Sequence, residues 1–167
     1  MYITDIQGPF SCAAQMWGIQ GFLCDMRECP NEAHHLLSLC TDAIIAYFHE
    51  KIGEAFGGIM THTCGNMNHL AGVMNGMKTL KCVNFSASET DLRQYAREHD
   101  SKAALLVHKS ALSINGLPLL DTEGHIRLCK EVQEESGVNV IANALYTDVP
   151  LSEGNRKKWL DAARLGG

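Results

Sequence analysis

A histidine and a cysteine two residues apart are the first groups in this sequence that could do chemistry. They are His62 and Cys64, in the stretch IMTHTCGN over residues 59–66. On a strand over 59–63, residues i and i+2 share a face, so both side chains can reach one point. Imidazole nitrogen and thiolate sulfur are both zinc ligands, although a catalytic zinc normally takes three protein ligands. On spacing alone, the simpler interpretation is that His62 hydrogen-bonds a neighbour and Cys64 packs.

The same pair also permits metal-free chemistry. A thiolate is favoured near the start of a helix, so Cys64 could be a nucleophile. His62 is the general base that a shared strand face would place beside it. The sequence leaves this alternative open.

Polar residues also stand at the ends of the other expected strands. They are Gln7, Asn84, His108 and Tyr146. In a parallel barrel, active-site residues lie at the carboxyl ends of the strands. We therefore expect these four side chains to form walls of a substrate pocket around His62 and Cys64.

The elements that must position these groups alternate between strands and helices. Apolar residues at helical spacing predict one long helix over 31–55 and a second over about 67–77. Further helices are expected after SETD at 88–91, from near Thr122 to Gly137, and from near Ser152. This alternation predicts βαβ units with a parallel sheet in one domain, residues 1–167. The expected strands are 2–6, 59–63, 80–85, 103–108 and 138–145.

Composition narrows the class of protein. The 167 residues are 46% hydrophobic and 20% charged, which is typical of one globular domain. The net charge of −5 argues against a nucleic-acid partner. Neither an apolar run near 18 residues nor signal-peptide features are apparent, so we expect no membrane partner. The seven cysteines contain no CxxC pair and predict reduced thiols in a cytoplasmic protein.

The order of several short motifs resembles the uroporphyrinogen decarboxylase superfamily. IQGPFSCAAQMWG at 6–18 resembles its third strand and following helix, and GGIMTHTCGN at 57–66 resembles its fifth strand. LKCVNFSASETDL, KAALLVHKSAL and VNVIANALYTDVPLSEG resemble strands six, seven and eight. The resemblance covers most of the chain and implies the (β/α)8 barrel fold. The superfamily also contains the methylcobamide:thiol methyltransferases.

The HTCG tip resembles the methyltransferase branch more than the decarboxylases. The resemblance implies that His62 and Cys64 bind zinc, which activates a thiol to accept a methyl group from a corrinoid partner protein. The family's third zinc ligand is a Cys after strand eight, where this sequence has none and Tyr146 lies close. One alternative is tetrapyrrole (uroporphyrinogen) decarboxylation in porphyrin biosynthesis, which uses no metal or cofactor. Another is a non-catalytic remnant or interaction module, so the resemblance leaves open whether this chain is an enzyme.

Two departures from the family predict a partial barrel. The chain begins at the third strand, so the residues that the family places on its first two strands cannot be assigned. The stretch at 40–58 joins two helices where the family has its fourth strand, which explains the long helix. About five strands then remain, with two open sheet edges. Open edges pair with other strands, so we expect self-association.

Overall fold

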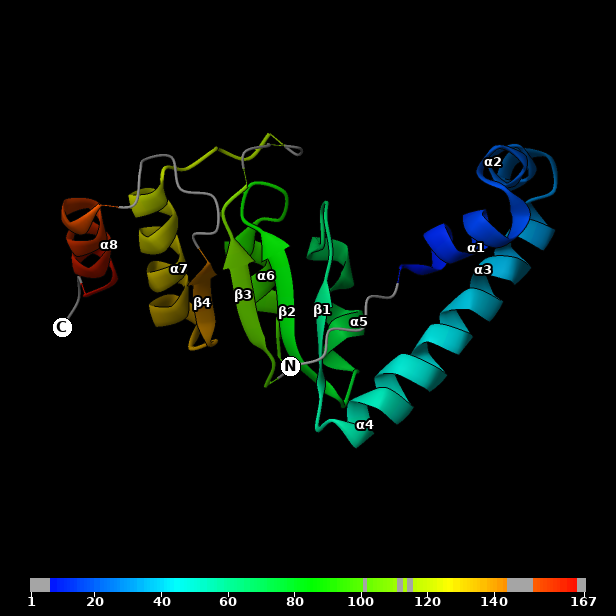
Figure 1. Ribbon diagram of the computed structural model, residues 1–167, viewed down its shortest axis with the longest axis horizontal. Coiled ribbons are helices and arrows are strands. Elements are labelled where there is room, and N and C mark those ends of the chain that lie inside the picture. Colours follow the sequence, from blue (N-terminus) through cyan, green and yellow to red (C-terminus); the bar gives the residue numbers. More distant parts are fainter. Residues whose placement is uncertain (1–6, 101, 111–112, 114–115, 144–151, 165–167) are drawn as a thin grey trace. The chain divides into compact units, whose positions relative to one another are not determined.

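The computed structural model describes residues 7–100, 102–110, 113, 116–143 and 152–164 (Figure 1). The chain divides into two compact units, Met1–Gly58 and Ile59–Gly167. The first is helical, and the second contains a sheet with helices. The expected strand at 2–6 lies outside the described residues.

The first unit is built from α1 (Pro9–Trp17), α2 (Ile19–Glu28) and α3 (Pro30–Ile44). Gly18 joins the first two helices at a φ of 93°, which favours glycine. The prediction of one long helix is confirmed: α3 continues through the π-helical segment Ile45–Ile52 into α4 (Gly53–Ala55). Helix α2 was not predicted. The core of this unit comprises Ala13, Ala14, Phe22, Ala33 and Cys40.

The second unit contains a parallel sheet of four strands in the order β1-β2-β3-β4. This confirms the expected α/β class and four of the five expected strands. The first and last strands in this order each pair with one neighbour among the described residues. The strands are β1 (Ile59–His62), β2 (Leu80–Ser86), β3 (Ala104–His108) and β4 (Val140–Asn143).

Helices of the second unit pack on one face of this sheet. Along β2 and β3, buried Val83, Phe85, Leu105 and Val107 alternate with half-buried residues that point to the other face: Cys82, Asn84, Ala104 and Leu106. The buried set packs against core residues from α5, α6 and α7. After β1 come a 3₁₀ turn (Asn68–Leu70) and α5 (Ala71–Asn75); the later helices are α6 (Leu92–Glu98), α7 (Thr122–Ser136) and α8 (Glu153–Arg164).

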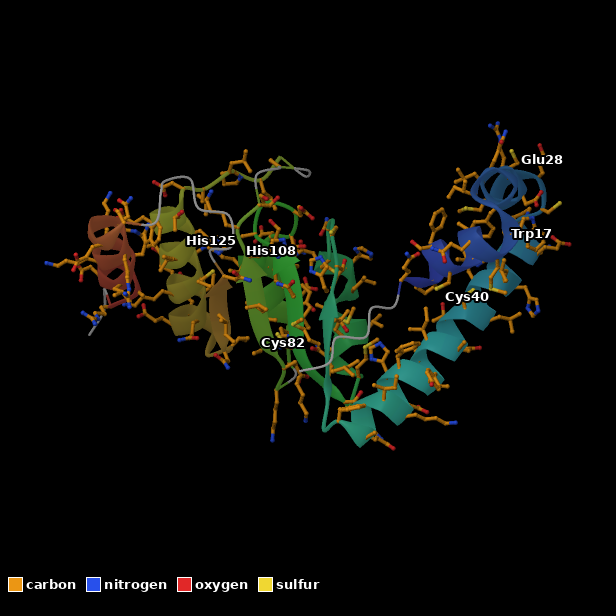
Figure 2. The ribbon with its side chains drawn as sticks, viewed as in Figure 1. Trp17, Glu28, Cys40, Cys82, His108 and His125 are labelled. Atoms are coloured by element: carbon orange, nitrogen blue, oxygen red, sulfur yellow. The ribbon has the colours of Figure 1, made fainter. Side chains whose placement is uncertain are left out.

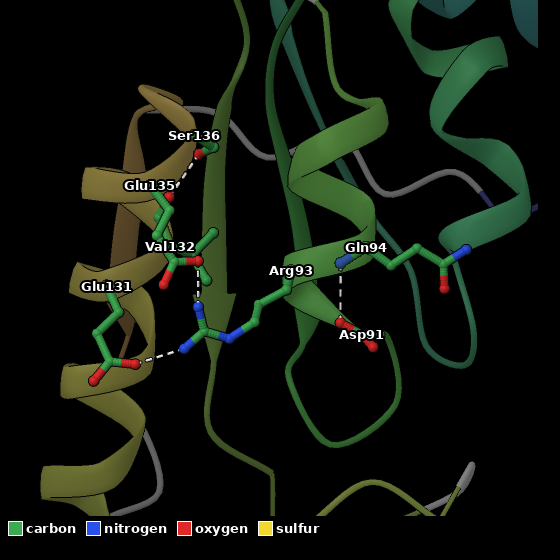
Figure 3. Close-up of polar contacts among 7 residues, drawn as sticks. All are labelled: Asp91, Arg93, Gln94, Glu131, Val132, Glu135 and Ser136. Atoms are coloured by element: carbon green, nitrogen blue, oxygen red, sulfur yellow. Dashed lines mark hydrogen bonds and ion pairs between the residues drawn. The ribbon is translucent and has the colours of Figure 1, made fainter.

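An N-cap hydrogen bond and a pair of salt bridges stabilise helix α6. Its N-cap residue Asp91 accepts a hydrogen bond from the backbone N–H of Gln94 (3.0 Å), which satisfies one of the free donors of the first turn. Arg93 reaches across to α7, where it pairs with Glu131 (2.6 Å) and also with Glu135 (Figure 3). The helices that support β2 and β3 are thereby joined to each other.

The predicted ends of α7 are also confirmed. Asp121 accepts a hydrogen bond from Gly124 N–H (2.7 Å) at its start. Gly137 follows its last residue in the left-handed conformation, with a φ of 72°. Among the described residues, no helix has the length and apolar character that crossing a membrane requires.

Candidate functional site

His62 and Cys64 come together at the carboxyl end of β1. His62 is the last residue of the strand, and the Cys64 thiol lies 3.6 Å from its Nε2 atom. Both side chains are exposed. The prediction that the two residues reach one point is confirmed. The simpler interpretation of the sequence was that His62 hydrogen-bonds a neighbour and Cys64 packs. The first part is right, whereas Cys64 is exposed and not packed in a core.

Asn84 on β2 connects His62 to the next strand. Its Oδ1 atom lies 2.6 Å from His62 Nδ1, and its Nδ2 atom lies 3.3 Å from His108 Nδ1. The imidazole rings of His62 and His108 have their centroids 5.5 Å apart. Register explains the meeting, because His62 pairs with Asn84 across the β1–β2 ladder and side chains at paired positions share a face. We call His62, Cys64, Asn84 and His108 the strand-end cluster.

His108, at the end of β3, is half-buried, as is Asn84, whereas His62 and Cys64 are exposed (Figure 2). Burial lowers the pKa of His108 below its ordinary value of 6.5, and a charge on His62 lowers it further. The carboxylate of Glu89 acts in the opposite direction and raises that pKa. Burial is the largest cause, so the neutral form of His108 is favoured.

A polar clamp holds the loop that carries Cys64. Gly65 N–H donates to the carboxylate of Glu89 (2.5 Å), and Thr90 Oγ1 donates to the Gly65 carbonyl (2.9 Å). Thr90 in turn accepts from the N–H of Met67 (3.0 Å). Glu89 is 6% exposed and Thr90 is fully buried. Gly65 has a φ of 93°, so a side chain at this position would be strained.

Sequence reasoning missed Glu89 and Thr90 as parts of the site. It treated SETD only as the start of a helix. Their signal was available, because this polar turn follows β2 directly and so lies at the same sheet edge as the end of β1. Two predicted pocket residues remain untested. Gln7 belongs to the first unit, where it is exposed and accepts a hydrogen bond from Gln15 (2.5 Å), and Tyr146 lies outside the described residues.

The geometry of the His62–Cys64 pair fits two corners of a zinc site. Zinc bonds of about 2.0 Å to nitrogen and about 2.3 Å to sulfur, at a tetrahedral angle, put the two donors about 3.5 Å apart. The observed Nε2–Sγ distance is 3.6 Å. Asn84 bonds the other ring nitrogen, in the place that a carboxylate, a backbone carbonyl or a water usually takes behind a metal-binding imidazole. In the part of the chain that the structure describes, no group of three or more His, Cys, Asp and Glu side chains could hold a metal ion.

Comparison with known proteins gives no family assignment. No protein-family model, no curated protein and no solved structure matches this chain.

Proposed function

We propose that His62 and Cys64 bind a zinc ion and that the protein transfers a methyl group from a methylated corrinoid protein to a small thiol. The observation that carries the proposal is the 3.6 Å spacing between His62 Nε2 and Cys64 Sγ, with the His62 Nδ1 atom held by Asn84. The motif order that resembles the corrinoid methyltransferases supplies the reaction class.

Each residue of the strand-end cluster has a defined part in this proposal. His62 and Cys64 provide two ligands, and the remaining positions are left for a further ligand and for the acceptor thiol. Bound zinc lowers the pKa of a thiol so that its thiolate is available at neutral pH. His108, whose pKa is lowered chiefly by burial, would stay neutral and would add no positive charge to a metal held by His62 and Cys64. In the transfer, the thiolate sulfur forms a bond to the methyl carbon, and the cobalt–carbon bond breaks with its electron pair left on cobalt.

Protection of Cys64 from alkylation by bound zinc tests whether His62 and Cys64 bind the metal. Alkylation of the purified chain, read residue by residue by mass spectrometry, is compared with and without one equivalent of zinc. Cys64 should be protected, whereas the exposed thiols of Cys24 and Cys29 serve as internal controls and should react as before. His62→Ala should abolish the protection of Cys64 without changing the two controls, because half of the pair is lost.

Methyl transfer is tested with methylcobalamin as the donor and 2-mercaptoethanol as the acceptor. The zinc-loaded chain should accelerate loss of the methylcobalamin absorbance, and the double variant His62→Ala, Cys64→Ala should remove the acceleration. Zinc at background level, together with equal alkylation of Cys64 in its presence and absence, would rule out the proposal. In that case the metal-free alternatives, a Cys64–His62 nucleophile pair and tetrapyrrole decarboxylation, are the ones to pursue.

A further inference from the structure

We propose that Asn84 is a positioning residue that fixes the tautomer of His62, so that the unprotonated Nε2 atom faces Cys64. The inference deepens the proposed function, on which its metal-binding part rests. The tautomer itself is a property of the metal-free chain and can be observed there.

The first step concerns the orientation of the Asn84 amide. One end of this side chain lies 2.6 Å from the backbone carbonyl oxygen of Leu106. A carbonyl oxygen can only accept a hydrogen bond, so the amide NH₂ group must be the end that faces it. The same NH₂ group lies 3.3 Å from His108 Nδ1, which gives its second hydrogen an acceptor. Both donors of the amide are thereby assigned to β3.

The second step carries this orientation to His62. With its NH₂ group turned to β3, Asn84 presents its carbonyl oxygen Oδ1 to His62 Nδ1 at 2.6 Å. An amide oxygen only accepts, so Nδ1 must carry the proton that forms this hydrogen bond. In the neutral imidazole the other nitrogen then has a free lone pair. That nitrogen, Nε2, is the atom 3.6 Å from the sulfur of Cys64.

The third step concerns the chemistry that an unprotonated Nε2 on His62 permits. An unprotonated Nε2 can bind a metal ion, or accept the thiol proton of Cys64, without first losing its own hydrogen. The opposite tautomer would direct an N–H at the sulfur and would have to rearrange before binding metal. The backbone of β3 thus determines, through one amide on β2, which nitrogen is available on β1. The register that aligns His62, Asn84 and Leu106 across three strands makes this possible.

The tautomer is measured by long-range proton–nitrogen NMR on the full ¹⁵N-labelled, metal-free chain at pH 8 with reductant. The two nitrogens of a neutral imidazole have well-separated shifts, so protonation at Nδ1 or Nε2 is read directly. His62→Gln assigns the signals by their loss. The wild-type chain should show a protonated Nδ1 and an unprotonated Nε2 at His62. A protonated Nε2 in the wild type overturns the inference, whatever the variants do.

Three variants then test whether Asn84 is the cause. Asn84→Leu removes the acceptor and keeps the branched shape of the side chain, and the Nε2-protonated form should become populated. Asn84→Asp keeps an oxygen for Nδ1 and should retain the wild-type tautomer. Asn139→Leu is the matched control, because it makes the same change on exposed residue 139, at the amino end of β4. A wild-type tautomer pattern in folded Asn84→Leu would overturn the role of Asn84.

Cobalt(II) binding separates this inference from the proposed function. The thiolate-to-cobalt absorption of the wild type is titrated beside that of Asn84→Leu, in which the affinity should fall about 10- to 100-fold. A wild type with the expected tautomer but without cobalt binding contradicts the proposed function and supports the inference. Cobalt binding by a chain with the opposite tautomer supports the metal site and contradicts the inference.

Discussion

The ring of Tyr95 packs against the ring of Phe85 in the core of the second unit, with centroids 4.9 Å apart. Tyr95 is fully buried, and within the described residues its hydroxyl has no hydrogen-bond partner. Burial raises the pKa of Tyr95 to about 12. The ring therefore stabilises the fold while the hydroxyl carries an uncompensated desolvation cost.

Tyr95→Phe should stabilise the protein because it removes the buried hydroxyl and keeps the ring. We expect the free energy of unfolding in urea to rise by about 1 kcal/mol. Tyr95→Leu is the control and should lower it by about 2 kcal/mol or more, since part of the ring volume is lost. A lower stability of Tyr95→Phe would mean that the hydroxyl has a partner.

Arg93→Ala should remove the ion pairs between helices α6 and α7 and lower the free energy of unfolding by about 1 kcal/mol, because one guanidinium serves two carboxylates at the surface. Arg127→Ala is the comparison, since Arg127 pairs with Glu123 (2.8 Å) within α7 alone and should cost about 0.5 kcal/mol or less. Both are measured by urea unfolding at low salt and in 1 M NaCl, where the difference should shrink. Equal costs for the two variants would contradict a role for Arg93 between helices.

His125 should make the second unit less stable in mild acid. It is 1% exposed, and its Nε2 donates to the carbonyl of Val107 (3.1 Å). Burial is the largest influence on the pKa of His125 and lowers it below the ordinary value of 6.5. The hydrogen bond to Val107 raises this pKa, and the charges of Lys109 and His108 lower it further. The buried neighbour Cys129, 3.9 Å away, has a pKa of about 12 and remains uncharged.

The direction of this pH dependence follows from how many protons the folded and the unfolded chain bind. Below pH 6.5 the unfolded chain protonates His125 while the folded chain does not yet, so the unfolded state binds more protons and stability falls as pH falls. One histidine contributes at most about 1.4 kcal/mol per pH unit. His125→Gln keeps a donor for Val107, so its stability should fall less than that of the wild type between pH 7 and pH 5. Parallel curves for the two proteins would contradict this assignment.

The exposed and the buried thiols should form two kinetic classes in the metal-free chain, with the half-buried Cys12 and Cys82 between them. Cys24, Cys29 and Cys64 are exposed, whereas Cys40 and Cys129 are buried. The first group should react with a disulfide reagent within minutes at pH 8, and the second only after unfolding in urea, which mass spectrometry can assign residue by residue. Rapid labelling of Cys129 in the native chain would show that α7 opens locally.

Several features could be predicted from the sequence for physical reasons. The parallel strands and the meeting of His62 with Cys64 follow from alternation and from period-two spacing. Helical spacing places Leu92, Tyr95 and Ala96 on one face of α6, and all three are buried. These patterns are local, so the residue types within one element are sufficient to predict them.

Other features depend on contacts between distant residues. Helical spacing over 67–77 alone would allow Val73 to face the core, but it is 58% exposed, because the five-residue helix α5 turns Ala71 and Met74 inward instead. The bonds of Asn84 to His62 and to Leu106 depend on the register of three strands, which no single segment determines. Glu89 has a role only because the loop after β1 folds against the turn after β2.

The position of β1 at the edge of the described sheet has a consequence for assembly. His62 lies on a strand whose outer backbone groups have no partner strand in the described part of the second unit. A strand from a second copy that added in parallel at this edge would end beside His62 and Cys64, and could deliver a ligand there. Metal binding and dimerisation would then be thermodynamically linked, so added zinc should lower the concentration at which light scattering detects a dimer.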